Sequence, residues 1–537
     1  MIDKIMSSPH RAFITLTSAF LLAILHQYLF YDFHIGVSYP IFVILFYCFM
    51  YTFAKDRMRA LTIFDAWIAA VILLLSLTYL LFDNVLFQVL NFMVIPGLIM
   101  THLTYVMGRK KRAWWEIGLI GTAIDHALPQ TIRHWGTIGS MMVQAGGRKM
   151  DKTQKAVVLK VLIGLLASVP MLLVVLTLLS SADGIFNEYL SGFPEWLDQI
   201  AVTPMLPRII WIIVAGVLFF SYVWGYVHPM QYEAEKRENA HWKDSTGSPL
   251  TPLHPAAEPL TSNPDTERKI TPAFTPVDSR IQTSPDGEPF RLDPVITGTI
   301  LTVMNSVYIL FVLVQFSYLF GTGEGHLPVD LSYAEYARNG FTELILVTSL
   351  NFLMLVVVLQ YTHAKGKKGV IVQQALLLIL VCCSAVMLSS AFVRLNLYEQ
   401  AYGYTYIRFL VHAFMIFLAL LLVIAALRIR CTKLPLIRCY IVLGLTAYTV
   451  INYIGMDIRI AELNIERYHQ TGSIDAAYLA SLSADALPLL QDFAENDYPE
   501  LKTNLVERKK YLDLHADGAA WFSFNAARYR ARLELSE

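Results

Sequence analysis

The 537-residue sequence is 55% hydrophobic and only 16% charged, and its formal net charge is +0. A mean hydropathy of +0.49 is too high for a soluble globular protein of this length, so the bilayer must be its main solvent. Without excess positive charge the chain has no global field to gather nucleic acid, and we expect no nucleic-acid partner. The five cysteines form no disulfide framework and no zinc-ligand pattern, so neither a metal nor another cofactor is expected.

Apolar runs of about 20 residues, the length that a spanning helix needs, recur along the chain. About eleven such runs predict an all-α polytopic membrane protein. The first is interpreted as a retained anchor, because no small-residue cleavage site follows it. In chain order the predicted spans are Phe13–Phe33, Val37–Ala54, Leu61–Phe82, Val85–Met107, Ala156–Ser180, Ile209–Val227, Val295–Phe320, Phe341–Thr362, Val370–Val393, Tyr406–Leu427 and Tyr440–Met456.

Clusters of lysine and arginine occupy alternate loops, which predicts the orientation of the chain. The turns at His34–Gly36 and Asp83–Asn84 carry neither residue. The basic loops contain Lys55, Arg57, Arg59, Arg109, Lys110, Lys111, Arg112, Lys365, Lys367, Lys368, Arg428, Arg430, Lys433 and Arg438. We therefore expect a multi-pass protein of the bacterial plasma membrane with a cytoplasmic N-terminus, and everything after Met456 outside.

Four parts follow from these patterns: a six-helix membrane bundle (1–227), a cytoplasmic linker (228–293), a five-helix membrane bundle (294–456) and a small extracytoplasmic helical domain (457–537). The linker is rich in Pro, Ser, Thr and charge, a composition that cannot form a core and predicts disorder. Between Gly108 and Lys155, a cationic start followed by Trp114 and Trp115 predicts either a helix lying at the interface or a simple topology anchor. After Met456, apolar residues recur at helical spacing with ordinary charge density.

Ionisable residues inside spans are costly and mark candidate sites. His26, Asp65 and Lys160 fall in predicted spans. Because Asp65 and Lys160 lie near the cytoplasmic face, we expect them to pair or to reach the interface there.

Charged and tyrosine side chains converge at the outer face of the second bundle. Arg408 and His412 are four residues apart, so they share one helix face. The cluster is a binding site or gate for a polar or anionic solute, or an ion-paired layer that locks helix ends. Its members are Glu335, Arg338, Glu343, Arg394, Tyr398, Glu399, Arg408 and His412.

Several strings in the second half of the chain resemble a known family. They are Tyr333–Phe341, Arg394–Gly403, Asn464–Tyr468 and Asp475–Ala486. From about Ser180 to the C-terminus the chain resembles the bacterial membrane family named domain of unknown function 4173, which is related to the 4153 group. The resemblance implies a bacterial origin, a multi-span fold and an outer-face position for these strings, and it implies no catalytic residue.

No motif decides whether the protein is an enzyme: Walker A, His-Glu-x-x-His and Gly-x-Ser-x-Gly patterns are all absent from the sequence. The intramembrane polar groups favour transport or a channel-like role, acting on a small polar or anionic solute. A sensor or scaffold with an external domain, and an outer-leaflet enzyme acting on a lipid-linked substrate, are the alternatives. The lipid bilayer is the one partner that all three share.

Overall fold

The computed structural model describes residues 9–31, 34–109, 111–135, 137–138, 205–229, 292–320, 341–362, 366–516 and 520–535. Over these ranges the chain is helical, apart from turns and one isolated bridge between Leu292 and Thr362. Ten of the described helices are long and apolar enough to cross a membrane. The prediction of an all-α polytopic membrane protein is therefore confirmed. The predicted span Ala156–Ser180 and the predicted linker at 230–291 lie outside the described residues.

The first group of spanning helices comprises α2 (Pro9–Phe30), α3 (Ser38–Ala54), α4 (Ile63–Leu81), α5 (Val85–Met107) and α11 (Met205–Val227). Large side chains such as Tyr79, Phe220 and Trp224 fill the space between them and are almost completely buried. Helix α5 runs unbroken through Pro96.

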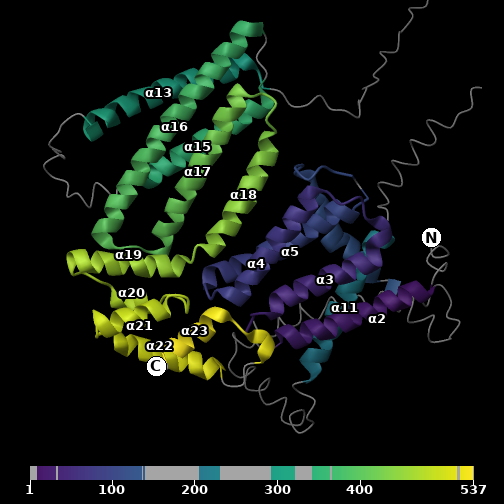
Figure 1. Cartoon of the computed structure of the whole chain (residues 1–537). Coiled ribbons are helices and arrows are strands. Elements are labelled where there is room, and N and C mark those ends of the chain that lie inside the picture. The colour runs from purple at the N-terminus through teal and green to yellow at the C-terminus, as the bar shows by residue number, and fades with distance from the viewer. Residues whose placement is uncertain are drawn as a thin grey trace, which may run out of the picture.

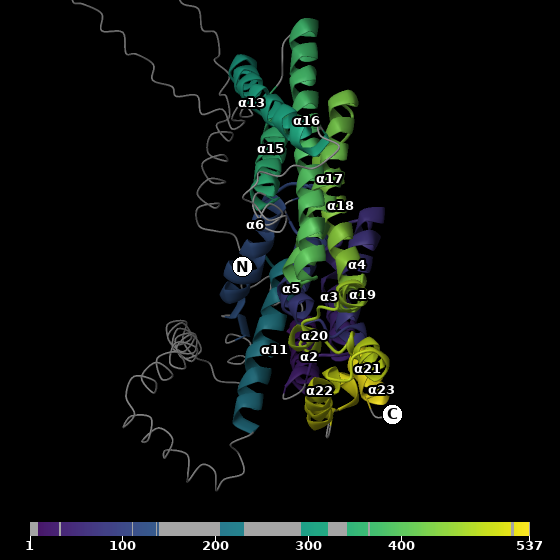
Figure 2. The ribbon, with the colours of Figure 1, turned by 90° about the vertical axis from the view of Figure 1, so that its left-hand side faces the viewer.

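The second group comprises α13 (Pro294–Phe320), α15 (Phe341–Tyr361), α16 (Gly366–Tyr402) and α17 (Tyr406–Arg430). Helix α18 (Leu436–Tyr453) joins the two groups: Leu445 and Tyr448 pack against the core of the first, and Tyr440 and Leu443 against the core of the second. Figure 1 shows α18 between the groups, and Figure 2 shows it running alongside α17.

The predicted span Val370–Val393 ends too early, because the helix that contains it, α16, continues to Tyr402. Leu395 and Glu399 extend the buried face that Ala391 belongs to, so packing continues past the apolar run that defined the predicted span. At 37 residues, α16 is longer than a bilayer core of about 30 Å requires.

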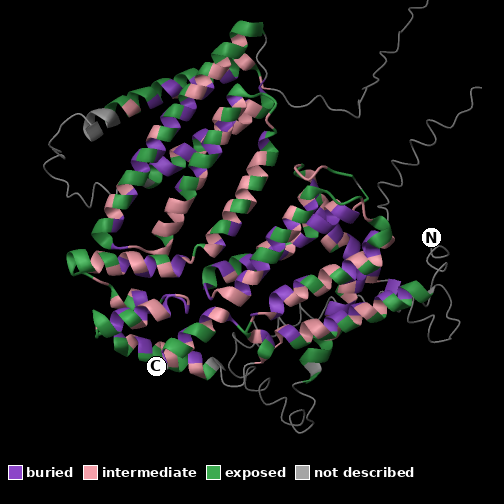
Figure 3. Ribbon diagram, in the orientation of Figure 1, coloured by how far each residue is buried: buried purple, intermediate pink, exposed green. Residues whose placement is uncertain are grey.

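The C-terminal domain is a small helical layer beneath the two groups (Figure 1). It contains α19 (Met456–Thr471), α20 (Ala476–Ala480), α21 (Leu487–Asn496), α22 (Leu501–Ala516), the short helix η3 (Trp521–Ser523) and α23 (Ala526–Glu534). Its core includes Ile460, Leu490 and Phe493, and it continues into the membrane part through Phe87 of α5. Figure 3 shows buried residues running from the domain into the helices above it.

The spanning helices have two distinct ends. The turns at residues 34–37, 83–84 and 403–405 contact the C-terminal domain, and we call this the domain end. The opposite, basic end carries Arg57, Arg59 and Arg438 together with α6 (Gly118–Asp125) and the π-turn η2 (His126–Gln130). Basic loops that alternate along the sequence thus share one end of the molecule.

Candidate functional site

The predicted outer cluster falls into two places at the domain end of the second group. Glu343 and Arg394 line one cavity of about 320 Å³, whose other walls are mostly apolar. Tyr398, Glu399, Arg408 and His412 meet at the turn between α16 and α17. Glu335 and Arg338 lie outside the described residues. The role of the cluster therefore stays a prediction.

At the α16–α17 turn each charged side chain contacts a neighbour. The Glu399 carboxylate is 4% exposed, and its Oε2 lies 3.3 Å from His412 Nε2. The Arg408 guanidinium donates to the Gly403 carbonyl and stands 4.3 Å from the centre of the Tyr398 ring. Arg408 and His412 both face α16, as their spacing predicts, and together they tie α17 to α16.

Residues of helix α19 form hydrogen bonds to this same turn. Gly403 has a φ of +83°, the left-handed conformation that ends many helices and favours glycine. Asn464 accepts from the Tyr404 amide at 3.0 Å and donates to its carbonyl at 2.9 Å. Arg467 donates to the carbonyls of Gln400 (2.9 Å) and Ala401 (2.7 Å), which the end of α16 would otherwise leave without partners. Two of the family-like strings therefore contact each other here.

The Asp457 carboxylate connects three parts of the chain. It is 1% exposed and accepts from Asn84 Nδ2 at 2.5 Å, from the Ser483 amide at 3.0 Å and from the Tyr406 hydroxyl. Asn84 belongs to the first group, Tyr406 to the second, and Ser483 to the C-terminal domain. A buried carboxylate without donors would be very costly, so Asp457 holds these three parts together.

Two further aspartates lie beside it. Arg528 of α23 places both Nε and Nη2 at 2.7 Å from Asp83 Oδ1. The Asp83 amide donates to Asp485 at 2.8 Å, and the Ser483 hydroxyl donates to the same carboxylate at 3.0 Å. Burial raises the pKa of Asp485 to about 6, against these two hydrogen bonds and with a smaller contribution from the negative charges of Asp457 and Asp83. We call Asp83, Asn84, Tyr406, Asp457, Ser483, Asp485 and Arg528 the junction.

The last helical segment secures the domain to the first group. Asn525 donates to the carbonyls of Tyr79 (2.9 Å) and Phe82 (2.8 Å) at the end of α4. The Phe524 carbonyl accepts from the Val37 amide at 3.0 Å, next to Gly36, where a Cβ would stand 2.4 Å from that carbonyl oxygen. The close approach of the two backbones therefore requires glycine there.

A cavity of about 460 Å³ opens where these elements meet. It lies between the C-terminal domain and the α4–α5 turn of the first group. Polar and aromatic side chains dominate its lining: His34, Asp83, Arg508, Tyr511, Trp521, Ser523, Asn525, Arg528, Tyr529 and Arg532. Arginine and aromatic side chains around one hollow are suited to an anion or to a ligand with an anionic part.

His26 and Asp65, the two of the predicted intramembrane candidates His26, Asp65 and Lys160 that the structure describes, both have partners. Trp211 Nε1 donates to His26 Nδ1 at 3.1 Å. Asp65 is 3.0 Å from Arg59 Nη2, completes the capping box of α4 and lies 3.6 Å from His102 Nε2. The pairing expected for Asp65 is thus present, whereas Lys160 lies outside the described residues. In the part of the chain that is described, no group of three His, Cys, Asp or Glu side chains could hold a metal ion.

Sequence reasoning did not select the junction. In the sequence, Asp83 and Asn84 stand out only as a turn without lysine or arginine, and Asp457 only as the first residue of the predicted C-terminal domain. Ser483 and Asp485 do lie in the family-like string Asp475–Ala486, which is the one signal in the sequence that points to the junction. Partners such as Asn84 and Asp457 are 373 residues apart, a pairing that local patterns do not reveal.

The model of one protein family, Domain of unknown function (DUF4153), matches residues 69–493. This is the group related to the 4173 family that the strings resemble; membership of the 4173 family itself is not shown. The match begins inside α4 and so extends further toward the N-terminus than the resemblance did. No curated protein and no solved structure matches the chain.

Proposed function

The chain belongs to the DUF4153 family, and from the geometry of its junction we propose that it is a membrane sensor or scaffold whose C-terminal helical domain is coupled to both groups of spanning helices. The observation that carries the proposal is the buried Asp457 carboxylate, which bonds to both groups and to the domain. Any displacement of the domain must break or move these bonds, so a change on one side is transmitted to two bundles at once.

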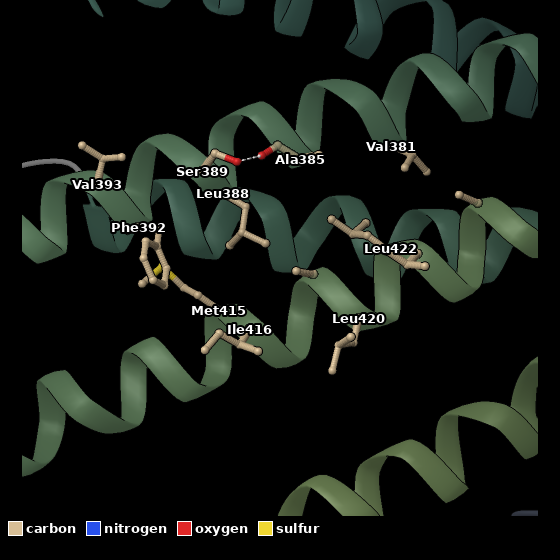
Figure 4. A pocket seen from close by; sticks show the side chains of 13 residues that line it. Val381, Ala385, Leu388, Ser389, Phe392, Val393, Met415, Ile416, Leu420 and Leu422 are labelled. Atoms are coloured by element: carbon tan, nitrogen blue, oxygen red, sulfur yellow. Dashed lines mark hydrogen bonds between the residues drawn. The ribbon is translucent and has the colours of Figure 1, made fainter. Parts of the chain in front are cut away.

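The cavity between α16 and α17 supports this proposal over transport. It measures about 560 Å³ and its lining is almost entirely apolar (Figure 4). Ser389, its one hydroxyl-bearing residue, donates to the Ala385 carbonyl of its own helix at 2.9 Å. A surface of this kind suits lipid chains and offers a polar solute no hydrogen bonds. Asp65 pairs with Arg59, and His26 accepts a hydrogen bond from Trp211, so both intramembrane groups likewise suit a structural role.

We place the basic end in the cytoplasm and the C-terminal domain outside, in a plasma membrane, because Lys and Arg mark the cytoplasmic end of spanning helices. A Thr503→Cys variant, with the five native cysteines replaced, should be labelled in intact cells by an impermeant thiol reagent, since Thr503 is exposed on α22. A Ser262→Cys variant should be labelled only after permeabilisation. Labelling of Ser262→Cys in intact cells would overturn this orientation.

Hydrogen–deuterium exchange tests the coupling. The full chain in lipid nanodiscs is compared with Asp457→Asn and with a control, Asp475→Asn. Asp475 lies in the same domain and caps α20 through the Tyr478 amide, a role that asparagine fills equally well.

A sensor or scaffold of the proposed kind predicts faster exchange in Asp457→Asn at the domain end and also at the basic ends of α4 and α17. The control should exchange like the wild-type protein. Faster exchange confined to the α19 region would show that the junction is a passive clamp and would refute the proposal.

A further inference from the structure

The cavity beneath the first group combines positive charge with exposed aromatic rings. Arg508, Arg528 and Arg532 line it, against the single carboxylate of Asp83. Its walls come from α22, η3 and α23 on one side and from the α4–α5 turn on the other. The lining therefore carries an excess of positive charge around a partly open cavity.

The guanidinium groups retain donors for a ligand. Arg508 donates through Nη2 to the Leu482 carbonyl at 3.2 Å, while its Nε is buried and has no hydrogen-bond partner among the described residues. Arg528 directs two of its five N–H donors at one oxygen of Asp83. Arg532 contacts Asp513 in a surface pair at 3.2 Å, with both side chains well exposed. Planar guanidinium groups that line one cavity can donate hydrogen bonds to the oxygens of a phosphate.

The position of the cavity indicates where such a phosphate would come from. Trp521 is 63% exposed and Tyr529 51% exposed, although both line the cavity. Phe522, next to Trp521, packs 4.8 Å from the Tyr28 ring near the end of α2, and Asn525 caps the end of α4. The ends of spanning helices lie at the depth of lipid headgroups, where tryptophan and tyrosine rings are enriched.

From this arrangement we infer that the cavity binds a phosphate group, and that a phospholipid with its headgroup at the domain end carries it. The phosphate lies among Arg508, Arg528 and Arg532, and the exposed rings contact the glycerol and the upper acyl chains. Binding at this point, beside Asp83, stabilises the docked position of α23; this link to the coupling of the domain rests on the proposed function, whereas the binding itself does not.

Titration calorimetry on the purified full chain tests the inference with three probes: dioctanoyl phosphatidylglycerol, glycerol phosphate and inorganic phosphate. Arg508→Gln and Arg532→Gln remove one cavity arginine each. Arg530→Gln is the matched control, because Arg530 lies on α23 outside the lining and, among the described residues, bonds only within its own helix, to the Ala526 carbonyl at 3.3 Å. Arg532 contributes only a surface pair, so its variant remains informative if Arg508→Gln fails to fold.

The wild-type protein and Arg530→Gln should bind the short-chain lipid with equal affinity, and each cavity variant should bind it about 10-fold or more weakly. Affinity for the lipid above that for both soluble phosphates supports the membrane source. Equal affinity for all three supports phosphate recognition and overturns the lipid as carrier. Absence of binding by every probe, or equal losses in Arg530→Gln and Arg532→Gln, overturns the site, whatever the exchange experiment shows about coupling.

Discussion

The junction predicts that Asn84 and Asp457 can exchange roles. In Asp457→Asn, an amide nitrogen faces the Asn84 amide nitrogen at the position where a carboxylate oxygen now accepts at 2.5 Å. Rotating the new amide by 180° does not help, because its nitrogen, a donor, then faces the Ser483 amide, which is also a donor. Asn84 cannot turn over either without losing its cap on the Phe87 amide. One donor is left without an acceptor in every arrangement.

The loss in free energy of unfolding expected for each variant follows from the burial of these side chains. Losing a hydrogen bond to a charged acceptor at a buried position costs about 2–3 kcal/mol. Asn84→Asp places two buried carboxylates against each other and should cost about 3 kcal/mol at neutral pH. In the double variant, the carboxylate at position 84 accepts from the amide at position 457 and still caps the Phe87 amide. The remaining cost is therefore about 1 kcal/mol, from donors that now meet a neutral carbonyl. The expected coupling energy is therefore about 4–5 kcal/mol, which is larger than the ~0.5–3 kcal/mol usual for neighbouring residues because both groups are buried.

Reversible unfolding of the purified protein in mixed detergent and SDS micelles, followed by tryptophan fluorescence, measures this cycle. The double variant should be markedly more stable than either single variant. Asp475→Asn, in the same domain, serves as the neutral control. If the two single losses simply add in the double variant, Asn84 and Asp457 do not contact each other as described.

The same interface supports three other predictions. Because the pKa of Asp485 is raised from 3.8 to about 6, its protonated form favours the folded state; the stabilisation, up to about 3 kcal/mol, is complete below pH 3.8 and is lost as pH rises through 6. Asp485→Asn should abolish that part of the pH dependence in thermal melts from pH 4 to 8, and an unchanged profile would contradict the assignment. Arg467→Ala should lower the free energy of unfolding by about 1–2 kcal/mol, because the carbonyls of Gln400 and Ala401 lose their donor, and Arg467→Lys should restore little of it. An Arg467→Ala variant as stable as the wild-type protein would show that these hydrogen bonds do not stabilise the turn. Gly403→Ala should be destabilising in the same assay, because its φ is +83° and a Cβ there would lie 2.9 Å from Asn464 Oδ1; an unaffected melting temperature would argue against this turn geometry.

The spanning helices could be predicted from the sequence because their cause is local. An apolar run such as Val85–Met107 must become a helix in lipid, since every backbone polar group has to be satisfied within it. The helical C-terminal domain was predicted by the spacing of apolar residues between Ile458 and Tyr468, which the structure forms into α19. The end of α16 is not predicted because charged and polar side chains break the apolar run beyond Val393, whereas the helix continues to Tyr402 in contact with α17 and α19.

The sequence by itself determined which segments enter the membrane and that the basic loops lie together, because hydropathy and charge act within about 20 residues. Which residues come together in the candidate site was decided only by the tertiary structure. Asp457 meets Asn84 across 373 residues, and Asp83 meets Arg528 across 445. Such pairs form because docking of the domain buries them and removes water from both partners, so each polar group must then find another. That requirement depends on which helix ends are brought together, a property of the folded chain that no local pattern carries.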